Sequence, residues 1–203
     1  MKKLLLILLL FACFSPLEAQ NSPCGEWKTF KEQGHYKVYV RECPDSPIKE
    51  FKVLDRFKGN FDTLIKLMND VKMTQILNKS CTEARIVKDL GKNETVQYFY
   101  FDMPLMLADR DVLTKCRTYN MPTAYKIESE TYSEDIVPLK KDAIRLKKVK
   151  TYYYFEKLPD GMIQMEYIGR ADPNGWIPAW LVNTMAQVEA HKMVDKLKRL
   201  VQR

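Results

Sequence analysis

The chain carries few histidines, the side chain most often used for acid–base catalysis and metal binding. Only two of its 203 residues are histidines, His35 and His191, and neither belongs to a nucleophile or metal motif. The triplet Asp109-Arg110-Asp111 could supply a carboxylate pair for acid–base catalysis. Neighbouring residues on a strand point to opposite faces, however, and a structural ion pair or turn cap fits the triplet better. The residues therefore predict no enzyme, no metal site and no cofactor.

Four cysteines follow an apolar N-terminal segment, at positions 24, 43, 81 and 116. Their spacing contains no CxxC pair, which disfavours a zinc ribbon. In an exported chain an even number is compatible with two disulfides, in any of three pairings. Buried free thiols are the alternative for some of them.

Residues 1–19 have the pattern of a secretory signal peptide. Lys2 and Lys3 precede the apolar run Leu4–Phe14, which is too short to span a bilayer, and Ala19 is a candidate cleavage position. Lipidation at Cys13 and an uncleaved anchor are the alternatives. We expect residues 20–203 to form one domain that is exported to the periplasm or secreted.

The elements that position the polar side chains are read from hydrophobic periodicity. Helical spacing predicts helices over 24–33 and 61–68, a short one around Met73–Leu77, and a long one over 178–201. The long helix carries an apolar stripe from Val182 to Leu200. Tight turns between consecutive strands favour an antiparallel sheet in an α+β fold. Strands are predicted over 35–43, 48–57, 83–90, 94–102, 111–120, 124–133, 143–157 and 161–171.

A sheet that curls around one long helix keeps a cavity wherever side chains do not fill the space between them. The inward faces are aromatic or aliphatic whichever way each strand faces. One strand, for example, presents either Tyr98 and Tyr100 or Phe99 and Phe101. Such a lining suits a lipid or other apolar ligand better than a charged metabolite.

Three sequence blocks resemble the START domain, the steroidogenic-acute-regulatory-related lipid-transfer fold, in its bacterial exported form. They are SPIKEFKV (46–53), ADRD (108–111) and ADPNGWIPAWLVN (171–183), within a resemblance that covers about 25–202. The resemblance implies a helix-grip fold, in which a curved antiparallel sheet of about eight strands wraps around the C-terminal helix. It also implies an apolar tunnel, closed by that helix and a lid loop, that binds lipid without chemistry.

The tunnel and lid are expected to use residues from three regions of the chain. The segment Met103–Asp111 is unusually apolar for a connecting loop, so it predicts a lid that also dips into a membrane, or else a loop tucked into the core. Cholesterol-binding members carry an arginine where Cys116 stands here, so a charged anchor is missing at that position. The expected ligand-binding residues are Tyr98, Tyr100, Met103, Leu105, Met106, Leu107, Thr114, Cys116, Tyr152, Tyr154, Met165, Tyr167, Trp176, Val182, Ala186 and Met193.

Two surface features could contact a membrane. Trp176 and Trp180 flank Pro178 at the start of the last helix, and they predict either an interfacial aromatic edge or packing that anchors the helix. Basic residues within 140–150 could attract anionic lipid or form a solvated face. Export disfavours nucleic acid as a partner.

The sequence thus predicts a monomeric binding module that holds one lipid or other apolar molecule, transfers it, and touches membranes transiently. A helix-grip enzyme of the polyketide cyclase or aromatase type is one alternative, and it would need an acid–base pair inside the cavity. An interaction domain with a filled core is the other. A cavity on the order of a few hundred Å³ would separate the filled core from the first two.

Overall fold

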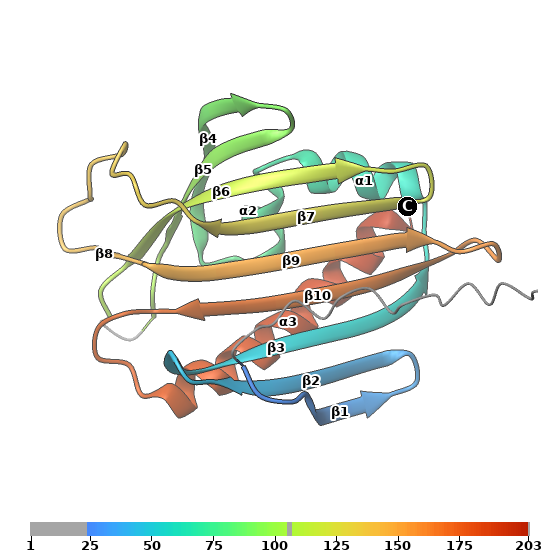
Figure 1. Cartoon of the computed structure of the whole chain (residues 1–203), viewed down its shortest axis with the longest axis horizontal. Coiled ribbons are helices and arrows are strands. Elements are labelled where there is room, and N and C mark those ends of the chain that lie inside the picture. Colours follow the sequence, from blue (N-terminus) through green and yellow to red (C-terminus); the bar gives the residue numbers. More distant parts are fainter. Residues whose placement is uncertain (1–23, 105–106, 203) are drawn as a thin grey trace, which may run out of the picture.

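The computed structural model describes residues 24–104 and 107–202, which form one curved sheet and three helices (Figure 1). The signal peptide predicted for residues 1–19 lies outside the described residues. The elements follow one another as β1 (Lys28–Gln33), β2 (Tyr36–Cys43), β3 (Ser46–Lys58), α1 (Phe61–Asn69), α2 (Met73–Leu77), β4 (Cys81–Gly91), β5 (Glu94–Phe101), β6 (Arg110–Asn120), β7 (Ala124–Thr131), β8 (Ile144–Arg145), β9 (Lys148–Lys157), β10 (Met162–Asp172) and α3 (Ala179–Val201).

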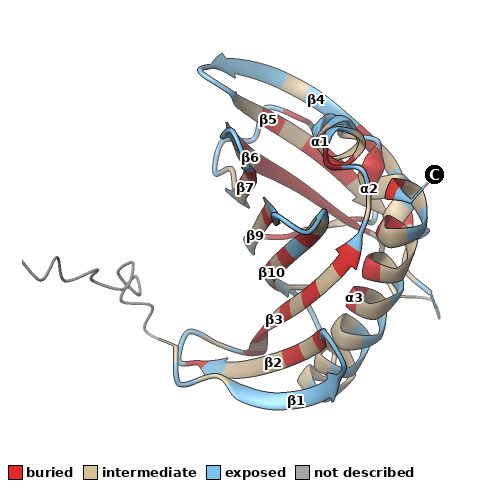
Figure 2. Ribbon diagram, turned by 90° about the vertical axis from the view of Figure 1, so that its right-hand side faces the viewer, coloured by how far each residue is buried: buried red, intermediate tan, exposed pale blue. Residues whose placement is uncertain are grey.

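The sheet has the strand order β1-β2-β3-β10-β9-β7-β6-β5-β4. Every pairing along this path is antiparallel, whereas the two-residue β8 pairs in parallel with β6. The pairing of β3 with β10 joins the N-terminal strands to the last strand. Figure 2 shows the sheet curving around the three helices, which confirms the predicted helix-grip architecture.

Helix α3 lies across the concave face and packs against β3. Its buried residues are Ala190, Val194, Leu197 and Val201, while Ala186, Met193 and Leu200 pack against the core at its edge. The end of the helix approaches the β3–α1 turn so closely that a Cβ on Gly59 would lie 2.7 Å from a Val201 methyl group. The backbone N–H of Asn60 also donates to the Val201 carbonyl at 2.8 Å.

Two predicted elements differ from the structure, and the described residues contain ten strands instead of about eight. Residues 24–33, predicted as a helix, include strand β1, which pairs with β2 from Lys28 to Gln33. The spacing of Trp27 and Phe30 fits a helix, but pairing with the edge of β2 satisfies the backbone better. The predicted strand 143–157 is divided into β8 and β9.

Strands β5 and β6 are buried on both faces. Their concave side belongs to the interior, and their convex side forms a second cluster of Val96, Tyr98, Leu113 and Val137. Val137 belongs to the long connection between β7 and β8, which covers this outer face. Because both faces are apolar, alternation alone cannot tell which residues of these strands point inward. In the described part of the chain, no helix is long and apolar enough to cross a membrane.

Candidate functional site

A cavity of about 260 Å³ lies between the concave face of the sheet and helix α2. One part of its wall is apolar, with Phe99 and Phe101 from β5, Val112 from β6, and Met73 and Leu77 from α2. Leu146 and Val149, around the start of β9, extend the same apolar surface. The cavity therefore offers an apolar ligand a surface on which part of its hydrocarbon is removed from water.

The cross-strand register aligns the polar side chains of the cavity wall. Gln97 on β5 pairs with Thr114 on β6, and Cys116 on β6 pairs with Ser129 on β7. Ser129 in turn pairs with Thr151 on β9. Directly paired residues share a face of the sheet, so these five line the cavity together. The wall is thus apolar at one part and carries uncharged polar groups at another.

Thr114 and Cys116 are both buried in this wall. Burial raises the pKa of the Cys116 thiol, so Cys116 is a neutral thiol at neutral pH. The hydroxyl oxygen of Thr114 has no hydrogen-bond partner among the described residues. A buried hydroxyl left without a partner costs about 1–3 kcal/mol, which a ligand oxygen could offset.

Tyr153 separates the cavity from the core beneath α3. Its ring stacks on that of Tyr167, with centroids 4.4 Å apart, and its hydroxyl donates to the Met193 sulfur at 3.4 Å. Burial raises the pKa of Tyr153 well above the ordinary tyrosine value. The side chain is therefore a neutral wall residue with its hydroxyl directed at the helix.

The START domain family profile matches residues 17–203, nearly the whole chain. This chain belongs to the START domain family. It is 26% identical over 166 residues to the uncharacterized protein PA1579 of Pseudomonas aeruginosa, covering 82% of each. It is also 26% identical over 136 residues to human START domain-containing protein 10. That match covers 67% of this chain but 47% of the relative, so the chain spans about half of that protein.

Solved structures show the same fold. The crystal structure of human STARD10 has a TM-score of 0.76 at 22% identity, covering 86% of this chain and 72% of that one. A STAR-related lipid transfer protein from Xanthomonas axonopodis has a TM-score of 0.74 at 24% identity, covering 87% and 99%. START homologues are thus lipid-binding and lipid-transfer proteins, a class whose fold this chain shares.

Two of the residues expected to line the START cavity, Thr114 and Cys116, lie in its wall. Met165 and Tyr167 instead belong to the buried core below α3, where Ala186 and Met193 pack against them. Val182 is half-buried near the start of the same helix. These five lie outside the cavity lining, because α2 rather than α3 covers this part of the sheet.

The expected tyrosines of β5 and β9 lie outside the lining of this cavity. The Tyr98 hydroxyl donates to Asp111 at 3.2 Å on the convex side, and Tyr100 donates to Asp109 at 2.7 Å. Phe99 and Phe101, the other face that we considered, line the cavity instead. On β9 it is Tyr153 that lines the cavity, and its neighbours Tyr152 and Tyr154 take the opposite face.

Arg110 joins the predicted lid segment to the loop before α3 by hydrogen bonds. Met103 and Leu107 are half-buried and lie outside the cavity lining, and Leu105 and Met106 lie outside the described residues. Asp109 accepts the backbone N–H of Met103 at 2.9 Å, and this bond, with that from Tyr100, lowers the pKa of its carboxyl group.

Each member of the triplet 109–111 has a structural partner. Arg110 donates to the backbone carbonyls of Pro173 and Asn174 at 3.1 and 3.0 Å. Asp111 forms an ion pair with Arg145 at 2.7 Å on the convex side. These contacts favour the structural interpretation of the triplet over a catalytic one.

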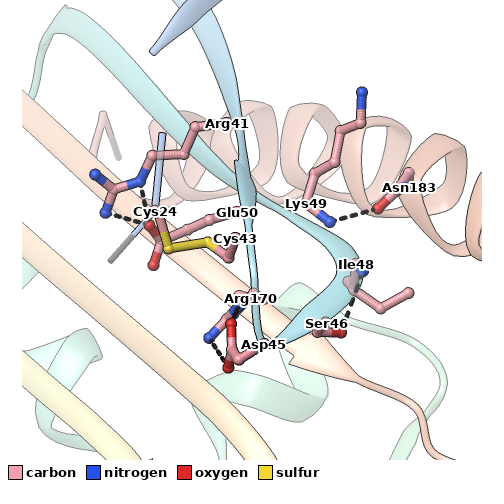
Figure 3. Close-up of a disulfide and its surroundings, with 10 residues drawn as sticks. All are labelled: Cys24, Arg41, Cys43, Asp45, Ser46, Ile48, Lys49, Glu50, Arg170 and Asn183. Atoms are coloured by element: carbon pink, nitrogen blue, oxygen red, sulfur yellow. Dashed lines mark hydrogen bonds and ion pairs between the residues drawn. A yellow bond between two sulfur atoms is a disulfide. The ribbon is translucent and has the colours of Figure 1, made fainter. Parts of the chain in front are cut away.

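The two tryptophans at the start of α3 are exposed, Trp176 at 91% and Trp180 at 70%. Their exposure contradicts the alternative that they anchor the helix by packing. The helix start is held instead by Asn183, whose side-chain oxygen accepts the backbone N–H of Lys49 at 2.9 Å (Figure 3).

The four cysteines divide into one disulfide and two free thiols. Cys24 is bonded to Cys43 at the end of β2, and the pair lies beside the Arg41–Glu50 ion pair (Figure 3). Cys81 and Cys116 are buried and free. The disulfide interpretation therefore applies to Cys24 and Cys43, and the interpretation as buried free thiols applies to Cys81 and Cys116.

Sequence reasoning missed Gln97, Ser129, Thr151 and the α2 residues of the wall. The strand residues could have been found by pairing neighbouring strands in register from Cys116, since Ser129 and Thr151 follow from it. The α2 residues carried no such signal, because only the packed fold places this short helix over β5 and β6.

Proposed function

We propose that this START domain holds one lipid or other apolar molecule in the cavity beneath α2 and carries it between membranes. The observation that carries the proposal is the 260 Å³ cavity, walled by Phe99, Phe101, Val112 and Leu146. Each buried CH₂ group contributes about 0.8 kcal/mol, so desolvation alone supplies affinity for an aliphatic chain.

The cavity favours a binding module over the two alternatives. A filled interaction domain would leave no such volume in its core. An acid–base enzyme needs two titratable groups at the reacting atoms. Among the described residues, the lining contains one carboxylate, Asp70, which is exposed at the junction of α1 and α2.

Transfer requires contact with a membrane, which the exposed Trp176 and Trp180 support because indole rings reside well at the lipid–water interface. The basic segment supports it less. Three of its side chains have partners in the protein, Lys140 with Glu83, Arg145 with Asp111, and Lys148 with a backbone carbonyl. We further infer that the protein is exported to the periplasm or secreted, which the Cys24–Cys43 disulfide supports, and that it acts as a monomer.

The test fills the cavity without disturbing the surface. Ser129→Phe places a ring in the wall between Cys116 and Thr151, and the exposed Ser133→Phe is its matched control. We expect Ser129→Phe to abolish binding of long-chain probes in a fluorescence displacement assay. The melting temperature of the empty protein should stay level or rise, because filling a void restores dispersion contacts.

Ser133→Phe should bind as the unmodified protein does. The proposal fails if the unmodified protein carries no apolar molecule in native mass spectrometry and no long-chain probe binds. It also fails if Ser129→Phe binds the probes undiminished.

A further inference from the structure

The polar residues that the sheet contributes to the cavity wall are all uncharged. Gln97 and Thr114 form one cross-strand pair, and Cys116 pairs with Ser129 in the adjacent row. The side chain of Gln97 is held in place by its own hydrogen bond, from Nε2 to the Thr95 hydroxyl at 3.1 Å. Thr114 is 4% exposed, and its hydroxyl has no partner among the described residues. A buried hydroxyl without a partner, on a residue that lines a cavity, is a candidate hydrogen-bond donor to a ligand.

The charges around the cavity exclude an ionised head group from its interior. Among the described lining residues Asp70 is the one charged group, and its carboxylate accepts the backbone N–H of Lys72 at 2.9 Å. No lysine or arginine belongs to the described lining. A carboxylate or phosphate placed beside Thr114 would be a buried charge without a counterion, which is strongly unfavourable. An alcohol, ester or ketone oxygen would instead satisfy the Thr114 hydroxyl without that cost.

The volume of the cavity limits the size of the ligand. Pockets for drug-sized molecules run from about 300 to 1,000 Å³, and this cavity, at about 260 Å³, lies below that range. A lipid with two long acyl chains exceeds it, whereas one aliphatic chain or a compact ring system does not.

We propose that Thr114 binds the polar head group of the lipid in this START domain. We further propose that the cavity selects a single-chain or compact lipid with an uncharged hydroxyl or carbonyl group. The inference rests on the proposed function and assigns its ligand class. Thr114 provides the hydrogen bond, and Gln97 and Cys116 border it with neutral side chains. The apolar wall from Phe99 to Leu146 holds the hydrocarbon part.

The test compares three probes of equal chain length, dodecane, 1-dodecanol and dodecanoate at pH 8, by displacement of a fluorescent long-chain probe. Thr114→Val removes the hydroxyl with little change of shape, and Thr114→Ser retains it. Thr118→Val is the matched control, since Thr118 lies on the same strand outside the cavity lining. A neutral hydrogen bond contributes about 0.5–1.5 kcal/mol, so Thr114→Val should weaken 1-dodecanol binding roughly 2- to 13-fold and leave dodecane unchanged.

Further outcomes follow from the same reasoning. Dodecanoate should bind at least about tenfold more weakly than 1-dodecanol. Thr114→Ser and Thr118→Val should bind like the unmodified protein. The empty Thr114→Val protein should melt at the same or a higher temperature, because it no longer buries an unpaired hydroxyl.

Three results would overturn the assignment while leaving the proposed function intact. The first is that Thr114→Val loses as much affinity for dodecane as for 1-dodecanol. The second is that dodecanoate binds as tightly as the alcohol. The third is that the protein retains dioleoyl phosphatidylcholine from vesicles in native mass spectrometry. Failure of all three probes to bind the unmodified protein, with no vesicle lipid retained, would instead contradict the proposed function itself.

Discussion

The guanidinium group of Arg110 donates a hydrogen bond of 3.0 Å to the backbone carbonyl of Asn174, 64 residues further along the chain. Arg110 begins β6 and is 3% exposed, and it also donates to the carbonyls of Ala108 and Pro173. One buried side chain thus joins the segment before β6 to the loop before α3. Because Trp176 lies in that loop, the same contact positions the exposed aromatic edge.

Arg110→Lys should loosen this connection, because an ammonium group cannot reproduce the fork of a guanidinium. We expect a loss of about 1.5–3 kcal/mol in the free energy of unfolding, typical of hydrogen bonds to a charged group. Ligand exchange in a stopped-flow assay should also become faster. Urea unfolding provides the stability, with the exposed Arg85→Lys as control. Equal stability of the two variants would show that the carbonyl contacts contribute nothing.

Acid should weaken the hydrogen bond between Met103 and Asp109 within the predicted lid. The folded-state pKa of this carboxyl group is lowered by the bonds from Met103 and Tyr100, so its contribution is fully present above the ordinary aspartate value of about 3.9. The contribution is lost as the pH falls below that value through the lowered folded-state pKa. The melting temperature of Asp109→Asn should therefore be below that of the unmodified protein at pH 6, and the two should converge near pH 2. A difference that persists at pH 2 would contradict this assignment.

Removal of the disulfide should destabilise the N-terminal edge of the sheet. Cys24 and Cys43 close a loop with a sequence separation of 19, and a loop of that length stabilises by about 3 kcal/mol through the unfolded chain. Cys24→Ser with Cys43→Ser should thus lower the melting temperature by roughly 6–12 °C in calorimetry. The unmodified protein in a reductant should match the double variant. An unchanged melting temperature in both would show that the bond does not contribute.

The exposed tryptophans should matter for membranes and not for folding. Trp176→Ser combined with Trp180→Ser should reduce co-sedimentation with phosphatidylglycerol-containing vesicles and slow lipid transfer between vesicles. The melting temperature should stay within about 1 °C, since exposed side chains contribute little to stability. Phe30→Ser on β1, also an exposed aromatic at 54%, is the control and should bind vesicles normally. Unchanged vesicle binding in the double variant would show that these tryptophans do not contribute to membrane binding.

Cys116 reports directly on occupancy of the cavity. Burial raises the pKa of its thiol, so alkylation by iodoacetamide at pH 7.5 should be slow in the empty protein. A saturating long-chain alcohol should slow it further by covering the wall. Cys81, also buried and free, lies outside the lining and serves as the internal control in peptide mass spectrometry. Equal protection of both thiols, or none, would place the ligand elsewhere.

Much of the fold could be predicted because its signals are local. Each of β2, β3, β10 and α3 buries one face, so its apolar residues recur with the period of a strand or a helix. Periodicity alone therefore identified these elements. The helix predicted for residues 24–33 was wrong. The spacing of Trp27 and Phe30 fits a helix, but the edge of β2 offers hydrogen-bond partners for a strand. On α3, Val194 and Val201, which the predicted stripe omits, are more buried than Met193 and Leu200, which it includes.

The cavity required information that no single segment holds. The sequence by itself determined the class of the fold and the uncharged side chain at Cys116. Only the tertiary structure decided that Phe99, and not Tyr98, faces inward, because the covering of β5 by the connection from β7 makes both of its faces apolar. It also decided that α2 covers the cavity while α3 packs on solid core. Both outcomes depend on which distant segments meet across the sheet, and that is settled by packing rather than by local periodicity.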